Sequence, residues 1–222
     1  MKLLNFQLAI FVEETIERPD KTYNSINEAC NELYDSIPQI LNIPADAPAE
    51  IPRVQGRNSD NTKTINVSVN RIDAHWNFNF ESQTSLLDSI KNVSQEVENV
   101  IKAVTESHRV VREGLVYTGF EENTESVKAI NERYLSSKYK PSITELAIRQ
   151  NEVIQNKGFS INNIRTIESS VLSNNIKTYT GVTVQWDINN VPEKRSLTAS
   201  ELIFLFEQSL ERVNGDIDRG VI

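Results

Sequence analysis

Asp73 and His75 are the residues whose types and spacing come nearest to a catalytic pair. They stand two positions apart in residues 62–80, a stretch whose alternation predicts β-structure, so both side chains would point to the same face. A carboxylate beside an imidazole can orient that ring as a general base. With Arg71 nearby, the pair defines one hypothesis: a metal-independent, hydrolase-like enzyme that uses the polar face of a hairpin.

The same polar face also suits binding without catalysis. A histidine on an exposed sheet face is most simply a solvent-facing side chain, available to a partner. The residues that would form this binding face are Asn66, Arg71, His75 and Asn77.

A β-hairpin over residues 62–80 would position these side chains. Its apolar positions alternate with polar ones and then change phase, which a two-residue turn at positions 70–71 explains. That turn pairs Val69 with Ile72 and gives the hairpin one apolar face and one polar face. Trp76 lies on the apolar face and is expected to be buried.

The chain lacks the patterns that metals and cofactors need. Cys30 is the only cysteine, and the two histidines, His75 and His108, lie far apart in the sequence. No phosphate-binding glycine loop and no nucleophile elbow occurs. We therefore expect no metal and no organic cofactor. Cys30 falls on the apolar stripe of a predicted helix over residues 25–37, where a small core residue is expected rather than a nucleophile.

Charge and composition exclude several classes of protein. The formal net charge is −8, from 31 acidic and 23 basic residues, which disfavours general nucleic-acid binding and anionic membrane surfaces. Asn5 and Gln7 interrupt the apolar N-terminal run, so a signal peptide is not expected, and no segment is long enough to span a bilayer. A single cysteine allows no intrachain disulfide. We expect a cytoplasmic protein.

Apolar periodicity predicts an α+β chain. The expected strands cover residues 4–12, 53–57 and 110–120, the hairpin at 62–80, and a second hairpin with strands at 161–172 and 176–188. The expected helices cover residues 25–37, 84–107, 124–135, 142–156 and 198–213. The last of these opens with a capping box at Thr198 and Glu201.

The two halves of the chain, residues 1–108 and 109–222, share one element order. Each half predicts a β-α-β-β-α arrangement, with an antiparallel sheet backed by helices. A short set of residues recurs at a constant offset: Ala29, Asn31, Glu32 and Tyr34 match Ala129, Asn131, Glu132 and Tyr134. Trp76 and Trp186 also fall at similar points in the two hairpins. The pattern leaves open an internal duplication or a chance recurrence, and two domains or one continuous domain.

The helix predicted at residues 198–213 is more apolar than one buried face requires. Ile203 and Phe204 lie outside its core-facing stripe, and Phe204 is about 200° around the axis from Leu202. Cover for them would come from residues 142–156 or from the same helix in a second subunit. We favour the second subunit, which predicts a homodimer with Ile203 and Phe204 at its interface.

These observations favour a non-enzymatic interaction protein that acts through protein binding or self-association. The hydrolase-like enzyme built on Asp73 and His75 is the alternative. A compact cleft around His75 would favour the enzyme, whereas an open, flat sheet face would favour the binding protein.

Overall fold

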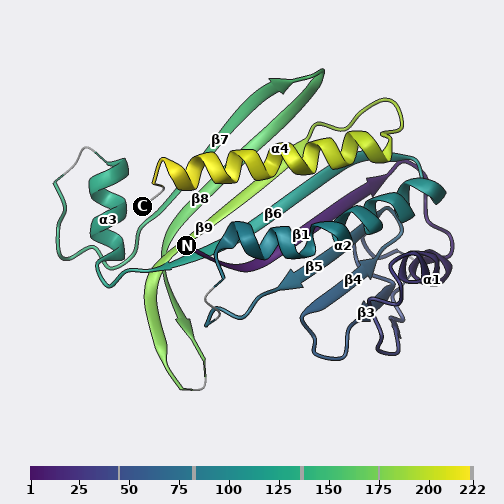
Figure 1. Ribbon diagram of the computed structural model, residues 1–222, viewed down its shortest axis with the longest axis horizontal. Coiled ribbons are helices and arrows are strands. Elements are labelled where there is room, and N and C mark those ends of the chain that lie inside the picture. Colours follow the sequence, from purple (N-terminus) through teal and green to yellow (C-terminus); the bar gives the residue numbers. More distant parts are fainter. Residues whose placement is uncertain (45, 82–83, 136–137, 175, 221–222) are drawn as a thin grey trace.

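One antiparallel sheet runs through the molecule, with its nine strands in the order β2-β3-β4-β5-β1-β6-β9-β8-β7 among the described residues. The computed structural model describes residues 1–44, 46–81, 84–135, 138–174 and 176–220 (Figure 1). The strands are β1 Lys2–Val12, β2 Gln39–Ile40, β3 Val54–Arg57, β4 Lys63–Val67, β5 Arg71–Asn77, β6 Val110–Glu122, β7 Ala147–Asn156, β8 Phe159–Ser173 and β9 Thr178–Asn190. The chain is α+β, as its sequence predicts.

Two long helices lie side by side over the centre of the sheet (Figure 1). The helices in the described part of the chain are α1 Pro19–Ala29, α2 Leu86–Ser107, α3 Ser126–Tyr134 and α4 Ala199–Asp218. The helix α2 covers β1 and β6, and α4 packs against β6 and α2. The helix α1 fills the space over β3 and β4 beside α2, whereas α3 packs against β8 and β9 near the end of α4.

A row of aromatic side chains crosses the sheet under these helices. Phe6 on β1 lies opposite both Trp76 on β5 and Tyr117 on β6, and Tyr117 lies opposite Trp186 on β9. The Phe6 ring centroid is 5.4 Å from that of Trp76 and 4.8 Å from that of Tyr117. Trp76 is 1% exposed and Trp186 is 0% exposed, so the predicted burial of both indoles is confirmed.

The two halves join in the middle of the sheet, where β1 pairs with β6. Each half therefore contributes strands to one shared sheet. With the two-residue β2 set aside, each half has the order β-α-β-β-β-α, one strand more than the predicted β-α-β-β-α. The extra strands are β3, which the sequence predicts at residues 53–57, and β7.

The strand β7 replaces the helix predicted at residues 142–156, so that prediction was wrong. Long-range pairing with β8 decides the outcome, because it places Ile148 opposite Ile167 and Ile154 opposite Ile161. A two-residue turn at positions 157–158, with positive φ at both residues, matches the twist of the two strands.

The first hairpin forms with a register two residues away from the predicted one. Val67, rather than Val69, lies opposite Ile72. Ser68 explains the longer loop, because its backbone N–H and its hydroxyl both donate to the carbonyl of Arg71. A shift of two residues leaves every side chain on its predicted face.

Two helix boundaries also differ from the prediction. The helix α1 begins at Pro19 and ends at Ala29, so Ser25 does not cap it, and Ile37, expected on its apolar stripe, is 91% exposed. Proline at the first helical position explains the earlier start. The capping box of α4 is confirmed, but α4 continues past the expected stop to Asp218.

Candidate functional site

Asp216 joins α4 to the sheet through three hydrogen-bonded or charged partners. Its Oδ2 accepts a hydrogen bond from the indole Nε1 of Trp186 at 2.9 Å and lies 3.1 Å from Nη1 of Arg165. Its Oδ1 accepts a hydrogen bond from Nη2 of Arg219 at 2.6 Å. Arg165 also donates to the side chain of Gln150 at 2.6 Å. A buried tryptophan N–H usually has such an acceptor, and here that acceptor also holds two arginines.

The first half of the chain contains a matching set. Trp76 Nε1 donates to Glu96 on α2 at 2.8 Å, and Lys63 Nζ lies 2.6 Å from the other oxygen of Glu96. Lys63 lies opposite Trp76 in the sheet, as Arg165 lies opposite Trp186. Each half thus places a tryptophan, a cation and a helix carboxylate in one cluster.

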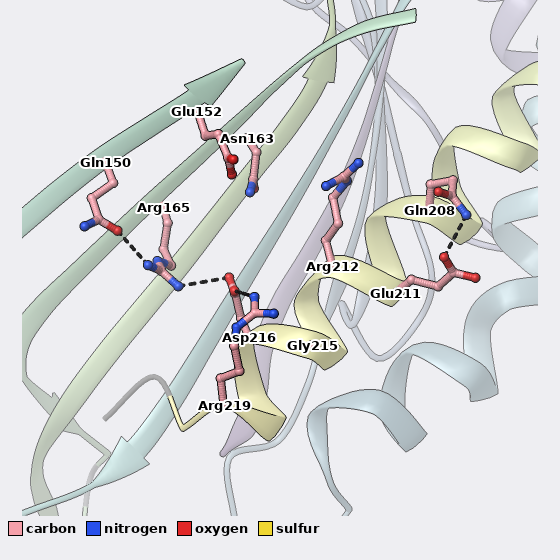
Figure 2. Close-up of a pocket in the computed structure, with 10 residues that line it drawn as sticks. All are labelled: Gln150, Glu152, Asn163, Arg165, Gln208, Glu211, Arg212, Gly215, Asp216 and Arg219. Atoms are coloured by element: carbon pink, nitrogen blue, oxygen red, sulfur yellow. Dashed lines mark hydrogen bonds and ion pairs between the residues drawn. The ribbon is translucent and has the colours of Figure 1, made fainter. Parts of the chain in front are cut away.

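A polar groove of about 480 Å³ lies beside the Asp216 cluster, between α4 and the β7–β8 hairpin. Figure 2 shows its ten lining residues: Gln150, Glu152, Asn163, Arg165, Gln208, Glu211, Arg212, Gly215, Asp216 and Arg219. The groove is open because α3 lies near the end of α4 and leaves the hairpin uncovered there (Figure 1). In the first half, α1 covers the corresponding strands.

Arg212 is a groove residue with unused hydrogen-bonding capacity. Its side chain projects from α4 into the groove, with no interaction drawn to it (Figure 2). Within the residues that the structure describes it makes no hydrogen bond or ion pair, and its Nε is buried without a partner. Nε of Arg165 and Oδ1 of Asn163 are also buried without partners. Unpaired buried polar atoms are costly, so these groups are expected to meet water or a ligand.

The charges of the groove divide between its floor and its rim. Arg165 and Arg219 pair with Asp216, and Arg212 adds a further positive charge that no carboxylate among the described residues neutralises by direct contact. Glu152 and Glu211 are exposed at the rim. The arrangement fits a ligand with an anionic centre and flanking cations.

Glu113 and Arg212 both line a small void of about 10 Å³, which is room for one water molecule. Arg212 and Gln208 line both this void and the groove. The two carboxyl oxygens of Glu113 are buried without hydrogen-bond partners. Burial raises the pKa of Glu113 well above its ordinary value. Among the described residues, no hydrogen bond or ion pair joins this carboxyl to Arg212.

The lining of the groove contains acids, amides and arginines but no serine, threonine, cysteine, histidine or lysine. Its ionisable side chains are carboxylates and guanidinium groups. These groups can bind a ligand through charge and hydrogen bonding.

The residues predicted from the sequence lie on the opposite, helix-free face of the sheet. Asp73 is 8% exposed, and its Oδ1 accepts hydrogen bonds from Nε of Arg71 and Nε2 of Gln7, each at 2.8 Å. Its carboxylate is therefore already engaged. Asn66 accepts a hydrogen bond from Gln55 at 2.9 Å.

His75 lies between Thr64 and Gln7 in the sheet and lines none of the grooves described above. Burial lowers the pKa of His75, and the charge of Asp73 partly opposes this effect. Asn77, at the end of β5, accepts a hydrogen bond from Asn5 at 2.8 Å. The structure thus brings the four predicted binding residues to one face, and the hydrolase hypothesis stays a prediction.

Ile203 and Phe204 are both partly buried. The Lys157 ammonium, in the β7–β8 turn, lies 4.3 Å from the centroid of the Phe204 ring. Part of the cover for Phe204 therefore comes from the same chain. Cys30 is buried, as expected, and burial raises the pKa of its thiol to about 11.

Sequence reasoning missed Arg165, Arg212 and Asp216. One signal was available: a buried Trp186 needs an acceptor for its indole N–H. Asp216 escaped notice because the helix was expected to end before it.

No family model matches the chain, and a comparison with curated proteins finds no match. Among the described residues, no helix is long and apolar enough to cross a membrane. The same residues contain no cluster of three or more histidine, cysteine or acidic side chains suited to a metal ion.

Proposed function

We propose that this chain is a non-enzymatic interaction protein that binds a polypeptide segment in the groove between α4 and the β7–β8 hairpin. The segment carries an acidic residue flanked by basic ones. Its carboxylate pairs with Arg212 at the floor, and its cations meet Glu152 and Glu211 at the rim. The cytoplasm is the proposed compartment, which suits a chain with one cysteine.

The unpaired Arg212 guanidinium carries this proposal. An arginine can hold a carboxylate through two parallel N–H···O bonds, and such charge-assisted bonds are stronger than neutral ones. The flanking cations matter because the chain has a net charge of −8, which would repel a purely acidic segment.

Titration with a defined probe tests the proposal. The probe is the fluorescently labelled peptide Gly-Lys-Glu-Lys-Gly, and its counterpart carries glutamine in place of glutamate. Fluorescence anisotropy should show saturable binding of the glutamate peptide and binding about tenfold weaker for the glutamine peptide, since a charged hydrogen bond contributes about 1.5–3 kcal/mol.

A matched pair of variants locates the site. Arg212→Ala should weaken binding of the glutamate peptide about tenfold. Arg149→Ala removes the same charge from an exposed position on β7, outside the groove lining, and should leave binding unchanged. Equal affinity of the two variants, or no binding by the unmodified protein, would reject the groove as the site.

A homodimer is a separate part of the proposal, and α4, with Ile203 and Phe204 at the interface, is one of two candidate surfaces for that contact. It is supported by the partial exposure of both side chains. If α4 forms the contact, Phe204→Glu converts a dimer to a folded monomer, measured by light scattering. A monomeric unmodified protein at tens of micromolar would rule this interface out.

An internal duplication is a further proposal about the origin of the fold. It is supported by the mirrored strand order around β1 and β6 and by the two tryptophan–carboxylate–cation clusters. On this view the first half kept a covering helix over its outer strands, and the second half opened a groove.

A further inference from the structure

The two edges of the sheet differ in how well they are protected from pairing with another chain. One edge ends in β2, a strand of two residues, and four prolines surround it at positions 38, 44, 48 and 52. Short edge strands and prolines are features that prevent pairing with another chain. The other edge is β7, which has ten residues and contains no proline. Among the described residues, β7 is hydrogen-bonded to no strand other than β8.

The free hydrogen-bonding groups of β7 follow from its turn. Asn156 and Phe159 close a two-residue turn, so they form a hydrogen-bonded pair. Such pairs alternate along an antiparallel ladder, so the even-numbered residues of β7 bond to β8. The N–H and C=O groups of the odd-numbered residues, including Arg149, Asn151 and Val153, therefore point outward from the sheet.

We propose that β7 pairs with β7 of a second copy of this chain, antiparallel and centred on Asn151. A twofold axis through this residue places Arg149 opposite Val153 of the second copy. The outward groups of the odd-numbered residues then satisfy one another, in roughly ten backbone hydrogen bonds. The two sheets continue into one, and the interface is the same patch on both copies.

The side chains of β7 agree with this register. On the helix-facing side Ile148 meets Ile154 of the second copy, which is an apolar pair. Gln150 meets Glu152 of the second copy, a pair that can form a hydrogen bond. No like charges lie opposite each other, although moving the centre by one residue, to Glu152, would place the two Glu152 carboxylates face to face. Charge thus disfavours the register centred on Glu152, and the pairing of Ile148 with Ile154 favours the one centred on Asn151.

This pairing also bears on the groove. Gln150 and Glu152 line its outer wall, so the seam of the dimer runs beside both grooves and each copy extends the wall of the other. In this respect the inference rests on the proposed function. The β7 pairing and the peptide binding can fail separately. Light scattering and fluorescence anisotropy would distinguish a dimer that binds no peptide from a monomer that binds it.

A proline on the outward side of β7 tests the pairing. Asn151→Pro removes an outward N–H without touching the bonds to β8, and edge strands tolerate such a proline. Asn151→Ala is the matched control, since it removes the side chain and keeps the N–H. Size-exclusion chromatography with light scattering at tens of micromolar should give twice 25.2 kDa for the unmodified protein and for Asn151→Ala. Asn151→Pro should give a monomer with an unchanged far-ultraviolet circular dichroism spectrum.

Amide hydrogen exchange tests the pairing without relying on a variant that has to fold. In the unmodified protein, the amides of Arg149, Asn151 and Val153 should gain protection as the protein concentration rises. The amides of Gln150 and Glu152 should be protected at every concentration.

Three results would overturn the inference. These are a monomeric unmodified protein, outward amides whose protection does not change with concentration, and a dimer that Phe204→Glu dissociates while Asn151→Pro does not. The last result would place the interface on α4.

Discussion

The carboxylate of Asp216 lies 2.9 Å from the indole Nε1 of Trp186 and accepts its hydrogen bond. This contact ties the last turn of α4 to the middle of the second-half sheet. It also fixes Arg165, which lies directly opposite Trp186 on the neighbouring strand. The wall of the groove is therefore held by a buried hydrogen-bonded cluster rather than by a loop.

Removing the Asp216 carboxylate should destabilise the protein strongly. Asp216→Ala leaves the Trp186 N–H and the Arg165 guanidinium without their acceptor, which is expected to cost about 3 kcal/mol. Glu96→Ala removes the matching carboxylate of the first half, where Glu96 and Lys63 are more exposed, so about 1 kcal/mol is expected. Urea unfolding of both variants measures the difference. Equal losses would show that burial of the cluster does not set its strength.

Glu113 should make stability fall as pH rises. Its pKa is raised in the folded state, so the native protein keeps a proton that the unfolded chain loses above about pH 4.5. The contribution of this proton to the free energy of unfolding is fully present below that pH. As the pH rises, the contribution declines by about 1.4 kcal/mol per pH unit until the pKa of the folded state is passed.

Glu113→Gln replaces the titratable carboxyl with a neutral amide. At pH 8 the variant should have a higher free energy of unfolding than the unmodified protein, and this difference should become smaller toward pH 5. Urea unfolding at the two pH values measures it. A gap that does not depend on pH would mean that the Glu113 carboxyl is ionised in the folded protein.

The packing of α1 over β3 predicts the outcome of a small-residue change. A Cβ at Gly56 would overlap the ring of Tyr23, so Gly56→Ala should destabilise the protein by about 1–3 kcal/mol. A Cβ at Gly114 would meet its nearest neighbours at 3.7 and 3.8 Å, so Gly114→Ala is the tolerated control. Comparison of the urea midpoints tests this, and a tolerated Gly56→Ala would place α1 farther from the sheet.

Cys30 should be unreactive in the folded protein. It is 6% exposed, and burial raises the pKa of its thiol to about 11, so little thiolate is present at neutral pH. A colorimetric thiol reagent at pH 8 should label Cys30 only after urea is added. Rapid labelling of the native protein would contradict the core position.

Local patterns predicted the elements whose sequence signals are strong. The 22-residue helix α2, the central strand β6 and the capping box at Thr198 follow from periodicity and capping chemistry. The strand β7 could not be predicted in this way, because its structure depends on pairing with β8. The groove also escaped prediction: it exists because α3 packs on β8 near the end of α4 and leaves the rest of the hairpin uncovered, which is a tertiary arrangement that no local pattern encodes.

The resonance of the Arg212 Nε–H group reports directly on whether a peptide carboxylate binds in the groove. In ¹⁵N-arginine-labelled protein, this signal should shift progressively as the Gly-Lys-Glu-Lys-Gly peptide is added, because the peptide carboxylate approaches the unpaired guanidinium. The glutamine peptide should move it far less, and Arg149, outside the groove, should not respond to either peptide. An Arg212 signal that stays fixed while the peptide binds would contradict the account.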